Sequence, residues 1–157
     1  MQQSKEEVRR SICDLVSQAE AAIPTNSDDG QIACNFRGEI GEWRAHEFRI
    51  RKLGEDIRQL LAQSKVLRKD TDLQGNYMKV IKNRDGGRGR QSLVLLLGYK
   101  SCHSFANSLS KELDDPDIYG HVIDTLLKMR ADGFWREIEP FASHKITWIR
   151  NKAKRYC

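Results

Sequence analysis

Apolar residues recur every three or four positions along the first part of the chain, which is typical of one face of an α-helix. The residues of this first stripe are Val8, Ile12, Leu15, Val16 and Ala19. Ser4 and Glu7 precede the stripe in the S-x-x-E pattern of a capping box, in which each side chain satisfies a backbone N–H group of the first turn. Since Pro24 cannot continue a helix, the pattern predicts a helix that begins after Ser4 and ends near Ile23.

The same spacing continues through most of the chain. It predicts a second helix over 42–64 and a third over 73–83, with Asp72 near the start of the third. Leu93–Leu97 is an apolar run that periodicity alone cannot assign to helix or strand, but its four leucines against one β-branched residue favour a helix. Further helices are expected over 101–113, from the N-cap Asp115 to Gly133, over 134–139 and from Ser143 onward.

Residues 25–41 carry polar residues and glycines without a clear period. Seventeen residues without an element would be long for a connection in a compact domain. Two interpretations remain open: a short hairpin around 31–37, or a functional loop.

The second half of the chain shows a weak internal repeat. Leu93 and Val122 lie 29 positions apart, and Val122 and Ile149 lie 27 apart at similar places in their expected helices. A period of about 30 residues with two helices per period is typical of a helical-repeat stack, in which each pair is covered by its neighbours. A single helical bundle without repeats is the alternative.

The stretch 88–157 resembles HEAT repeats in one place. Asp115-Pro116-Asp117 followed by Val122-Ile123 is similar to a first repeat helix, and Trp148-Ile149-Arg150 followed by Ala153 resembles the family's valine-arginine and alanine pattern. Ile123 departs from the pattern, because the family often has arginine there. The resemblance implies an all-α fold with a short α-solenoid of antiparallel helix pairs. Residues 1–87 show no match and would form an irregular N-terminal portion of a single helical domain over 1–157.

Composition narrows the class of protein. The 157 residues are 39% hydrophobic and 31% charged, which fits one folded domain rather than a disordered chain. The longest apolar run has five residues, against about 20 for a bilayer-spanning helix. No apolar segment of a signal peptide follows Met1. We therefore expect a soluble, cytoplasmic protein that is not bound in a membrane.

Few residue patterns point to catalysis, metals or cofactors. Cys13, Cys34, Cys102 and Cys157 form no C-x-x-C pair, so reduced and mostly buried thiols are favoured over disulfides or zinc. His121 and Asp124 lie at i and i+3, a spacing that fits a general base with its orienting carboxylate or an ordinary surface pair. Because no nucleophile elbow is present, we expect no enzyme activity, no metal and no cofactor.

Two further motifs leave alternatives open. The glycine-rich segment 86–89 lacks the spacing of a phosphate-binding loop, so a flexible turn is favoured over anion contact through its backbone N–H groups. Some DNA glycosylases are built from HEAT-like repeats, and Trp135, Trp148 and Asp124 offer residues of the kind found in their clefts. Their spacing forms no motif of that class, and a repair enzyme remains the third hypothesis.

The net charge of +5 is unevenly distributed along the sequence. Residues 1–43 carry a net charge of −4 and residues 91–144 a net charge of −3, whereas 44–90 carry +7 and 145–157 carry five basic residues and no acidic one. If the fold brings the two basic blocks together, they form one basic surface. Its expected residues are Arg88, Arg90, Lys145, Arg150, Lys152, Lys154 and Arg155.

The pattern of paired helices and separated charge leads to a hypothesis about function. We expect a non-enzymatic helical-repeat scaffold that binds a protein partner. The alternative is a nucleic-acid-binding protein that uses the basic surfaces 44–90 and 145–155. Solvated helix faces of mixed charge would produce the same pattern without any partner.

Overall fold

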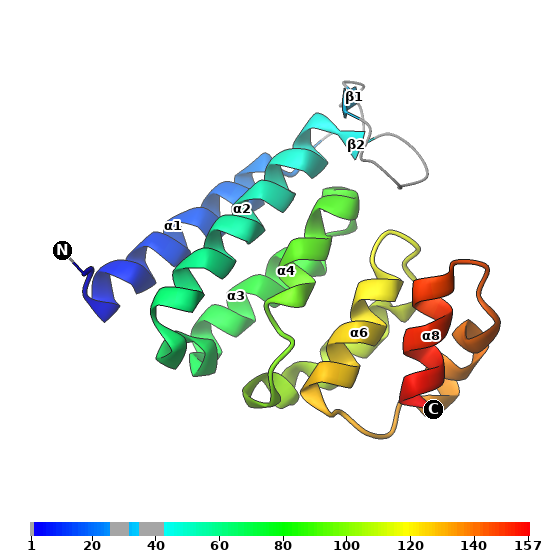
Figure 1. Cartoon of the computed structure of the whole chain (residues 1–157). Coiled ribbons are helices and arrows are strands. Elements are labelled where there is room, and N and C mark those ends of the chain that lie inside the picture. Colours follow the sequence, from blue (N-terminus) through cyan, green and yellow to red (C-terminus); the bar gives the residue numbers. More distant parts are fainter. Residues whose placement is uncertain (1, 26–31, 35–42) are drawn as a thin grey trace.

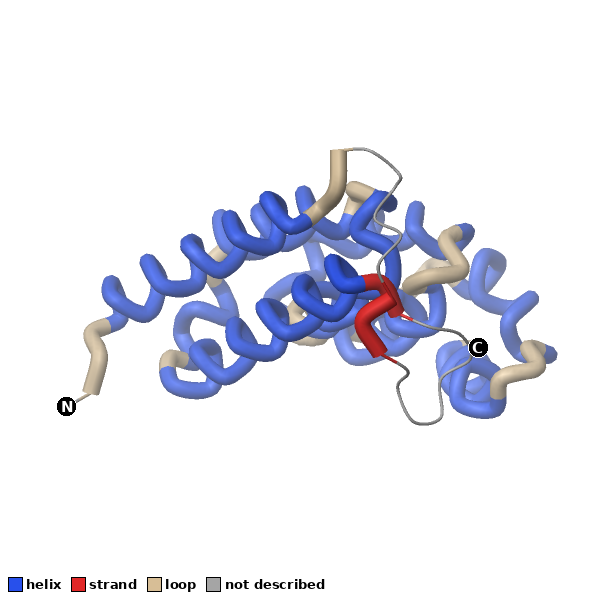
Figure 2. The backbone as a smooth tube through the Cα atoms, turned by 90° about the horizontal axis from the view of Figure 1, so that it is seen from above, coloured by secondary structure: helices blue, strands red, loops and turns tan. Residues whose placement is uncertain are grey.

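The computed structural model describes residues 2–25, 32–34 and 43–157, and in these ranges the chain is almost wholly helical. The helices are arranged along an elongated molecule, with the N-terminal helix at one end and the C-terminal helix at the other (Figures 1 and 2). The α-helices are α1 (Lys5–Ala22), α2 (Ala45–Gln63), α3 (Thr71–Ile81), α4 (Gln91–Leu95), α5 (Ala106–Ser110), α6 (Tyr119–Met129), α7 (Trp135–Ile138) and α8 (Thr147–Tyr156). The 3₁₀ helices are η1 (Lys65–Lys69), η2 (Arg84–Arg90), η3 (Lys100–Phe105), η4 (Lys111–Asp114) and η5 (Glu139–Ser143).

The contacts between helices follow a regular order. Helices consecutive in the sequence pack in pairs: α1 with α2, α3 with α4, α5 with α6, and α7 with α8. The second members of the pairs also contact one another in series, α2 with α4, α4 with α6 and α6 with α8 (Figure 1). We call these four helices the even-numbered row. The fold is therefore all-α, as the sequence predicts.

The first helices confirm the sequence pattern closely. Ser4 and Glu7 form the predicted capping box at the start of α1, and Ile23 ends the helix. Val8, Ile12, Val16 and Ala19 are buried on its inner face. Asp72 lies in the first turn of α3, as predicted, and the N-cap is Asp70, whose carboxylate accepts from the backbone N–H groups of Asp72 and Leu73.

The helices of the second half begin later than predicted. Helix α6 starts at Tyr119 rather than beside Asp115, because the chain first makes a turn in which the carbonyl of Asp115 accepts from Ile118 and Tyr119. The expected helix over 101–113 is divided into η3, α5 and η4. Helix α8 starts at Thr147 with Ile146 as its N-cap, so Ser143 is not the cap.

The predicted loop over 25–41 lies mostly outside the described residues. Strand β1 (Ile32–Cys34) pairs antiparallel with β2 (Trp43–Arg44), which immediately precedes α2. A strand therefore falls within the range expected for a hairpin, but its partner is β2 beyond that range. The remainder of 31–37 lies outside the described residues.

One cluster of buried apolar side chains runs from Val8 in α1 to Ala153 in α8. Its members come from every pair of helices, so burial of apolar surface connects the two ends of the molecule. Within the described ranges, none of the helices is long and apolar enough to cross a membrane.

Candidate binding surface and groove

The glycine-rich segment 86–89 packs tightly on the start of α2. The carboxylate of Glu47, which is 7% exposed, accepts from the backbone N–H groups of Arg44 and Arg88 at 2.8 and 3.0 Å. Gly87 has φ 57°, and a Cβ at Gly87 or Gly89 would overlap atoms of Glu47. The backbone N–H of Arg88 thus binds a carboxylate of the chain itself, and the segment is a packed turn rather than a flexible one.

Arg90 corrects the predicted basic surface. Its side chain is 0% exposed, and its guanidinium donates to the carbonyls of Gly87 and Ile81 and to the carboxylate of Asp115 at 2.9, 2.7 and 2.6 Å. Asp115 is itself 4% exposed. A buried arginine with these partners stabilises the fold and cannot contact a partner at the surface.

Arg84 joins the same two parts of the chain nearer to solvent. Its guanidinium lies 2.7 Å from the carboxylate of Asp114 and 3.3 Å from that of Glu112. Together with the pair of Arg90 and Asp115, these contacts join the basic block 44–90 to the acidic block 91–144. Two cations of the first basic block are consequently paired within the fold.

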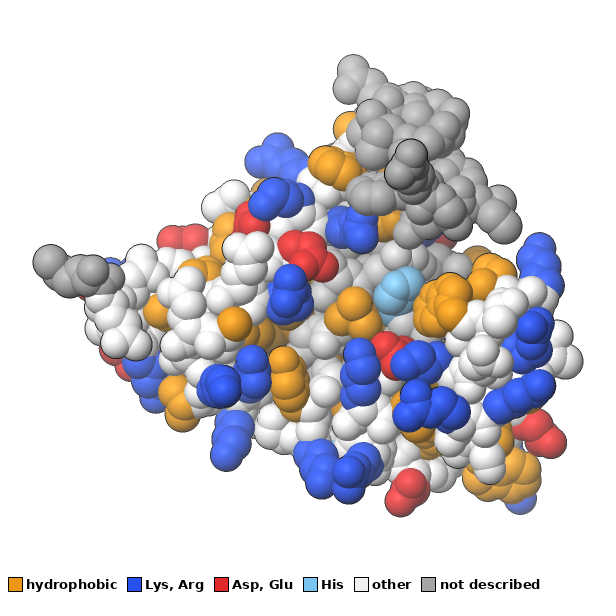
Figure 3. Space-filling model, viewed as in Figure 1, with side chains coloured by type: hydrophobic (Ala, Val, Ile, Leu, Met, Phe, Trp, Pro, Cys, Tyr) orange, Lys and Arg blue, Asp and Glu red, His pale blue; other side chains and the backbone are white. Residues whose placement is uncertain are grey.

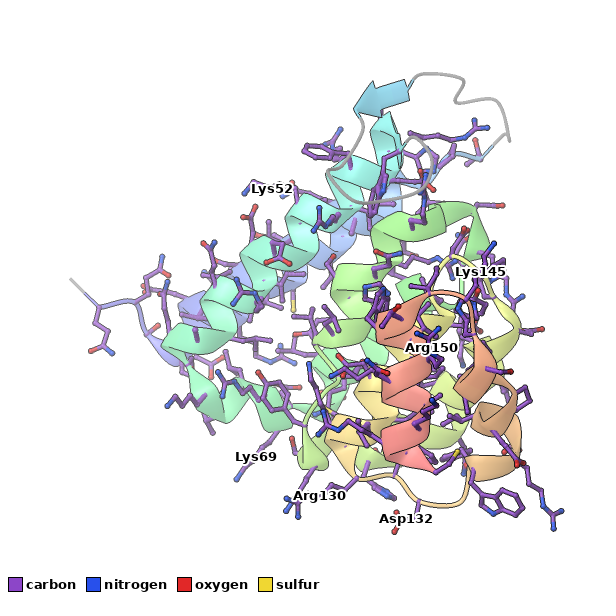
Figure 4. All side chains as sticks on the ribbon, turned by 45° about the vertical axis from the view of Figure 1, so that its right-hand side comes forward. Lys52, Lys69, Arg130, Asp132, Lys145 and Arg150 are labelled. Carbon is purple, nitrogen blue, oxygen red and sulfur yellow. The ribbon has the colours of Figure 1, made fainter. Side chains whose placement is uncertain are left out.

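The basic residues of 145–157 have a different environment. Lys152 pairs with Asp124 at 2.8 Å, and Arg150 donates to the carbonyl of His144 and the hydroxyl of Thr147. Figure 4 shows Arg150 on α8 and Lys145 before it. Lys145, Lys154 and Arg155 are exposed and form no ion pair with another described residue. We call these three residues the α8 cations.

The face of the even-numbered row carries many lysine and arginine side chains. Figure 3 shows them spread over this face, several of them over the part of the molecule where α8 lies, with a histidine beside a large hydrophobic side chain. Trp148 is 43% exposed, and its ring contacts His121 edge to face with 5.2 Å between centroids. A basic surface with an exposed aromatic ring is therefore present, but it is centred on α8.

A groove of about 270 Å³ lies where α4, α6 and α8 begin. Pro116, Ile146, Trp148 and Ile149 form its apolar side. Its polar side is formed by Arg88, Gln91, Asp117, Tyr119 and His121. Arg88 thus lies near the start of the last helix, whereas the buried Arg90 does not line the groove. The guanidinium of Arg88 stands over the ring of Trp43, 5.2 Å from the centroid.

Gly120 sets the distance between α6 and α8 at the groove. A Cβ at this position would lie 2.6 Å from a ring carbon of Trp148 and 2.9 Å from the side chain of Ile149. Only glycine therefore allows α8 to approach α6 so closely. This groove was not predicted from the sequence, although Gly120 within an apolar helical pattern was a signal of close packing.

The spacing of His121 and Asp124 was compatible with a general base and its orienting carboxylate or with an ordinary surface pair, and in the structure Asp124 pairs with lysines instead. The two carboxylate oxygens of Asp124 lie 2.8 Å from Lys152 and 3.1 Å from Lys128. Burial lowers the pKa of His121 to about 4, although Asp124 acts in the opposite direction. The imidazole is consequently neutral at pH 7, and the neighbouring carboxylate is held by lysines.

Comparison with protein-family models, curated proteins and solved structures finds no match for the chain. The groove and the surface at α8 must therefore be interpreted from their own chemistry. Cys13, Cys102 and Cys157 are free thiols, of which only Cys102 is buried. Among the residues that the structure describes, no cluster of histidine, cysteine or acidic side chains fits a metal ion.

Proposed function

We propose that the chain is a non-enzymatic binding module, built as a short HEAT-like stack of helix pairs, that binds an acidic protein partner at α8. The order of helix contacts supports the stack, because each pair packs on the next and the even-numbered row is continuous. Such a row presents one long side of the molecule to a partner.

The observation that carries the proposal is the distribution of ion pairs. Arg84 and Arg90 join the first basic block to acidic residues, and Lys152 of α8 likewise pairs with Asp124. The α8 cations, by contrast, form no ion pair with another described residue, and residues 145–157 contain no acidic side chain. Exposed charges of one sign attract a partner of the opposite sign and accelerate its association. An acidic protein segment fits this surface.

The arrangement around His121 supports a binding role rather than catalysis. A general base needs a pKa near the working pH and an orienting partner. His121 has a pKa of about 4, and the carboxylate of Asp124 is held by two lysines. The same engagement of Asp124 argues against the repair-enzyme hypothesis.

The test uses a fluorescein-labelled oligoglutamate peptide and fluorescence anisotropy at about 50 and 200 mM salt, because screening weakens contacts between exposed charges. Replacing the α8 cations with glutamine should weaken binding at least about tenfold, as expected for a loss of about 1.4 kcal/mol. The control replaces Lys65, Lys69 and Lys82, which are exposed cations on other elements, and removes the same net charge. If both variants lose the same affinity for the peptide, net charge alone explains the binding, and a site at α8 is contradicted.

A nucleic acid is the second candidate, favoured by one observation: Trp148 is exposed beside the cations of α8. Aromatic rings between basic residues form stacking platforms for single-stranded nucleic acids. The same titration is therefore repeated with a single-stranded oligonucleotide of equal charge. If the oligonucleotide binds more tightly than the peptide and loses affinity in the variant of the α8 cations, nucleic acid replaces the acidic protein as the partner.

A further inference from the structure

We infer that the groove between α4, α6 and α8 receives one aromatic side chain of the acidic partner, a tryptophan or tyrosine that anchors the segment. The inference rests on the proposed function and specifies what the partner must contain. The groove and the α8 cations would together recognise a short partner segment that contains one aromatic residue and several acidic residues, and acidity alone would not be enough.

The size of the groove favours a single side chain. Sites for drug-sized ligands and cofactors usually occupy about 300–1,000 Å³, and the groove has about 270 Å³. An aromatic side chain buries about 150–250 Å² and dominates the energy of many interfaces. The groove is therefore smaller than the usual site of a whole cofactor, and its apolar wall suits a single aromatic side chain.

The walls of the groove match an aromatic ring with one polar edge. Trp148 and Ile149 offer an apolar side, and the neutral imidazole of His121 lies against Trp148. On the opposite side the side chain of Asp117 is 42% exposed, and its carboxylate lies 3.9 Å from the guanidinium of Arg90. Asp117 is thus placed to accept from an indole N–H or a phenolic O–H.

The charges around the groove determine which residues flank the aromatic side chain in the partner segment. Burial and the neighbouring Asp115 raise the pKa of Asp117, but an acidic anchor beside this carboxylate would still be disfavoured by repulsion. Acidic residues of the partner are instead attracted to the α8 cations. Lys145 adjoins the groove residue Ile146, and Lys154 and Arg155 lie farther along the same helix as Trp148. The aromatic anchor and its acidic neighbours therefore contact one continuous surface.

Three labelled peptides test the inference against the intact chain: one with a central tryptophan among glutamates, one with alanine in place of the tryptophan, and one with glutamine in place of every glutamate. The first peptide should bind at least about tenfold more tightly than either of the others. Replacing its tryptophan with phenylalanine should cost several-fold in affinity, because the donor to Asp117 is lost. The variant Asp117→Asn should reduce this difference between tryptophan and phenylalanine.

Two tryptophan variants provide a matched comparison. Trp148→Ala should weaken the tryptophan peptide at least about tenfold and leave the alanine peptide unchanged. Trp135→Ala is the control, because Trp135 is 50% exposed and lies outside the groove. Circular dichroism and thermal unfolding of both variants establish that the fold is retained, and Gly120→Ala, which would displace Trp148, supplies a second perturbation of the groove.

The outcomes separate the inference from the proposed function. Equal binding of the tryptophan and alanine peptides overturns the aromatic anchor but leaves an acidic partner at α8. Failure of both acidic peptides to bind overturns the proposed function. If Trp148→Ala weakens only a single-stranded oligonucleotide, the groove accepts a base and the peptide anchor is wrong.

Discussion

At the scale of single residues, the role of a charged side chain depends more on the groups that it contacts than on its position in the sequence. Arg88 and Arg90 stand two positions apart in a glycine-rich basic segment. Arg88 lines the groove, whereas Arg90 is fully buried with three partners. Sequence alone predicted both as surface residues, because it does not show that Asp115, 25 positions away, faces the guanidinium.

The buried pair of Arg90 and Asp115 leads to a prediction about stability. Arg90→Ala leaves the carboxylate of Asp115 buried without its main cation, and removal of one member of a buried pair costs about 3–5 kcal/mol. We expect a loss of this size in the free energy of unfolding, measured by urea denaturation. Lys52→Ala is the control, because Lys52 forms an exposed pair with Asp56 and should cost only about 0.5 kcal/mol. Similar losses in both variants would contradict a structural role for Arg90.

The lowered pKa of His121 leads to a prediction about how the free energy of unfolding changes in mild acid. The folded protein keeps its imidazole neutral down to a pH of about 4, whereas the unfolded chain binds the proton near the ordinary pKa of 6.5. At this site the unfolded chain therefore holds more protons between these values, so His121 should lower the free energy of unfolding as the pH is lowered from about 6.5 to about 4.

Comparison of two histidine variants checks this pH dependence. His121→Gln should flatten the fall in unfolding free energy between pH 6.5 and 4, measured by urea denaturation across that range. His103→Gln, at an exposed position, should show the same dependence of unfolding free energy on pH as the unsubstituted protein. If the two variants show the same slope, the buried imidazole is not its source.

At the scale of elements, the sequence predicts best where a helix is determined by its own residues. Ser4, Glu7 and Pro24 determine the two ends of α1 locally, and all of these features are confirmed. The start of α6 is different, because Asp115 is bound by Arg90 from a distant segment and also accepts from the N–H of Asp117. The groove was not predicted either: Gly120 indicated a close approach, but the walls come from elements that meet only in the fold.

Glycines show the same contrast between local and distant determinants. A Cβ at Gly89 would overlap the carbonyl oxygen of Glu47 and lie 2.9 Å from the Cβ of Ile50. Gly89→Ala should thus lower the free energy of unfolding by about 1–3 kcal/mol, because the backbone of α2 must move. In α3, a Cβ at Gly75 meets nothing closer than Phe105 at 3.9 Å. Gly75→Ala should raise stability by about 0.5–1 kcal/mol, and thermal and urea unfolding of the two variants would test these opposite signs.

At the scale of the whole molecule, folding redistributes the charge that the sequence separates into blocks. The block 44–90 has a net charge of +7 and the block 91–144 a net charge of −3, and Arg84 and Arg90 join them. No comparable contact with an acidic block involves the α8 cations within the described part of the chain. The α8 cations are therefore available for a partner. Lys65, Lys69 and Lys82 are exposed as well, and the exposed ring of Trp148 and the adjoining groove distinguish the surface at α8.

This division of charge predicts that the two basic blocks respond differently to substitution. Replacing the α8 cations with glutamine should change the free energy of unfolding by no more than about 0.5 kcal/mol, as for other surface substitutions. Arg84→Glu should lower the urea midpoint clearly, because it places a further carboxylate beside Glu112, Asp114 and Asp115. Raising the salt concentration should reduce the effect of Arg84→Glu, because screening weakens the repulsion. A large loss of stability from the α8 substitutions would mean that these cations serve the fold, and the binding surface would then have to be sought on another face.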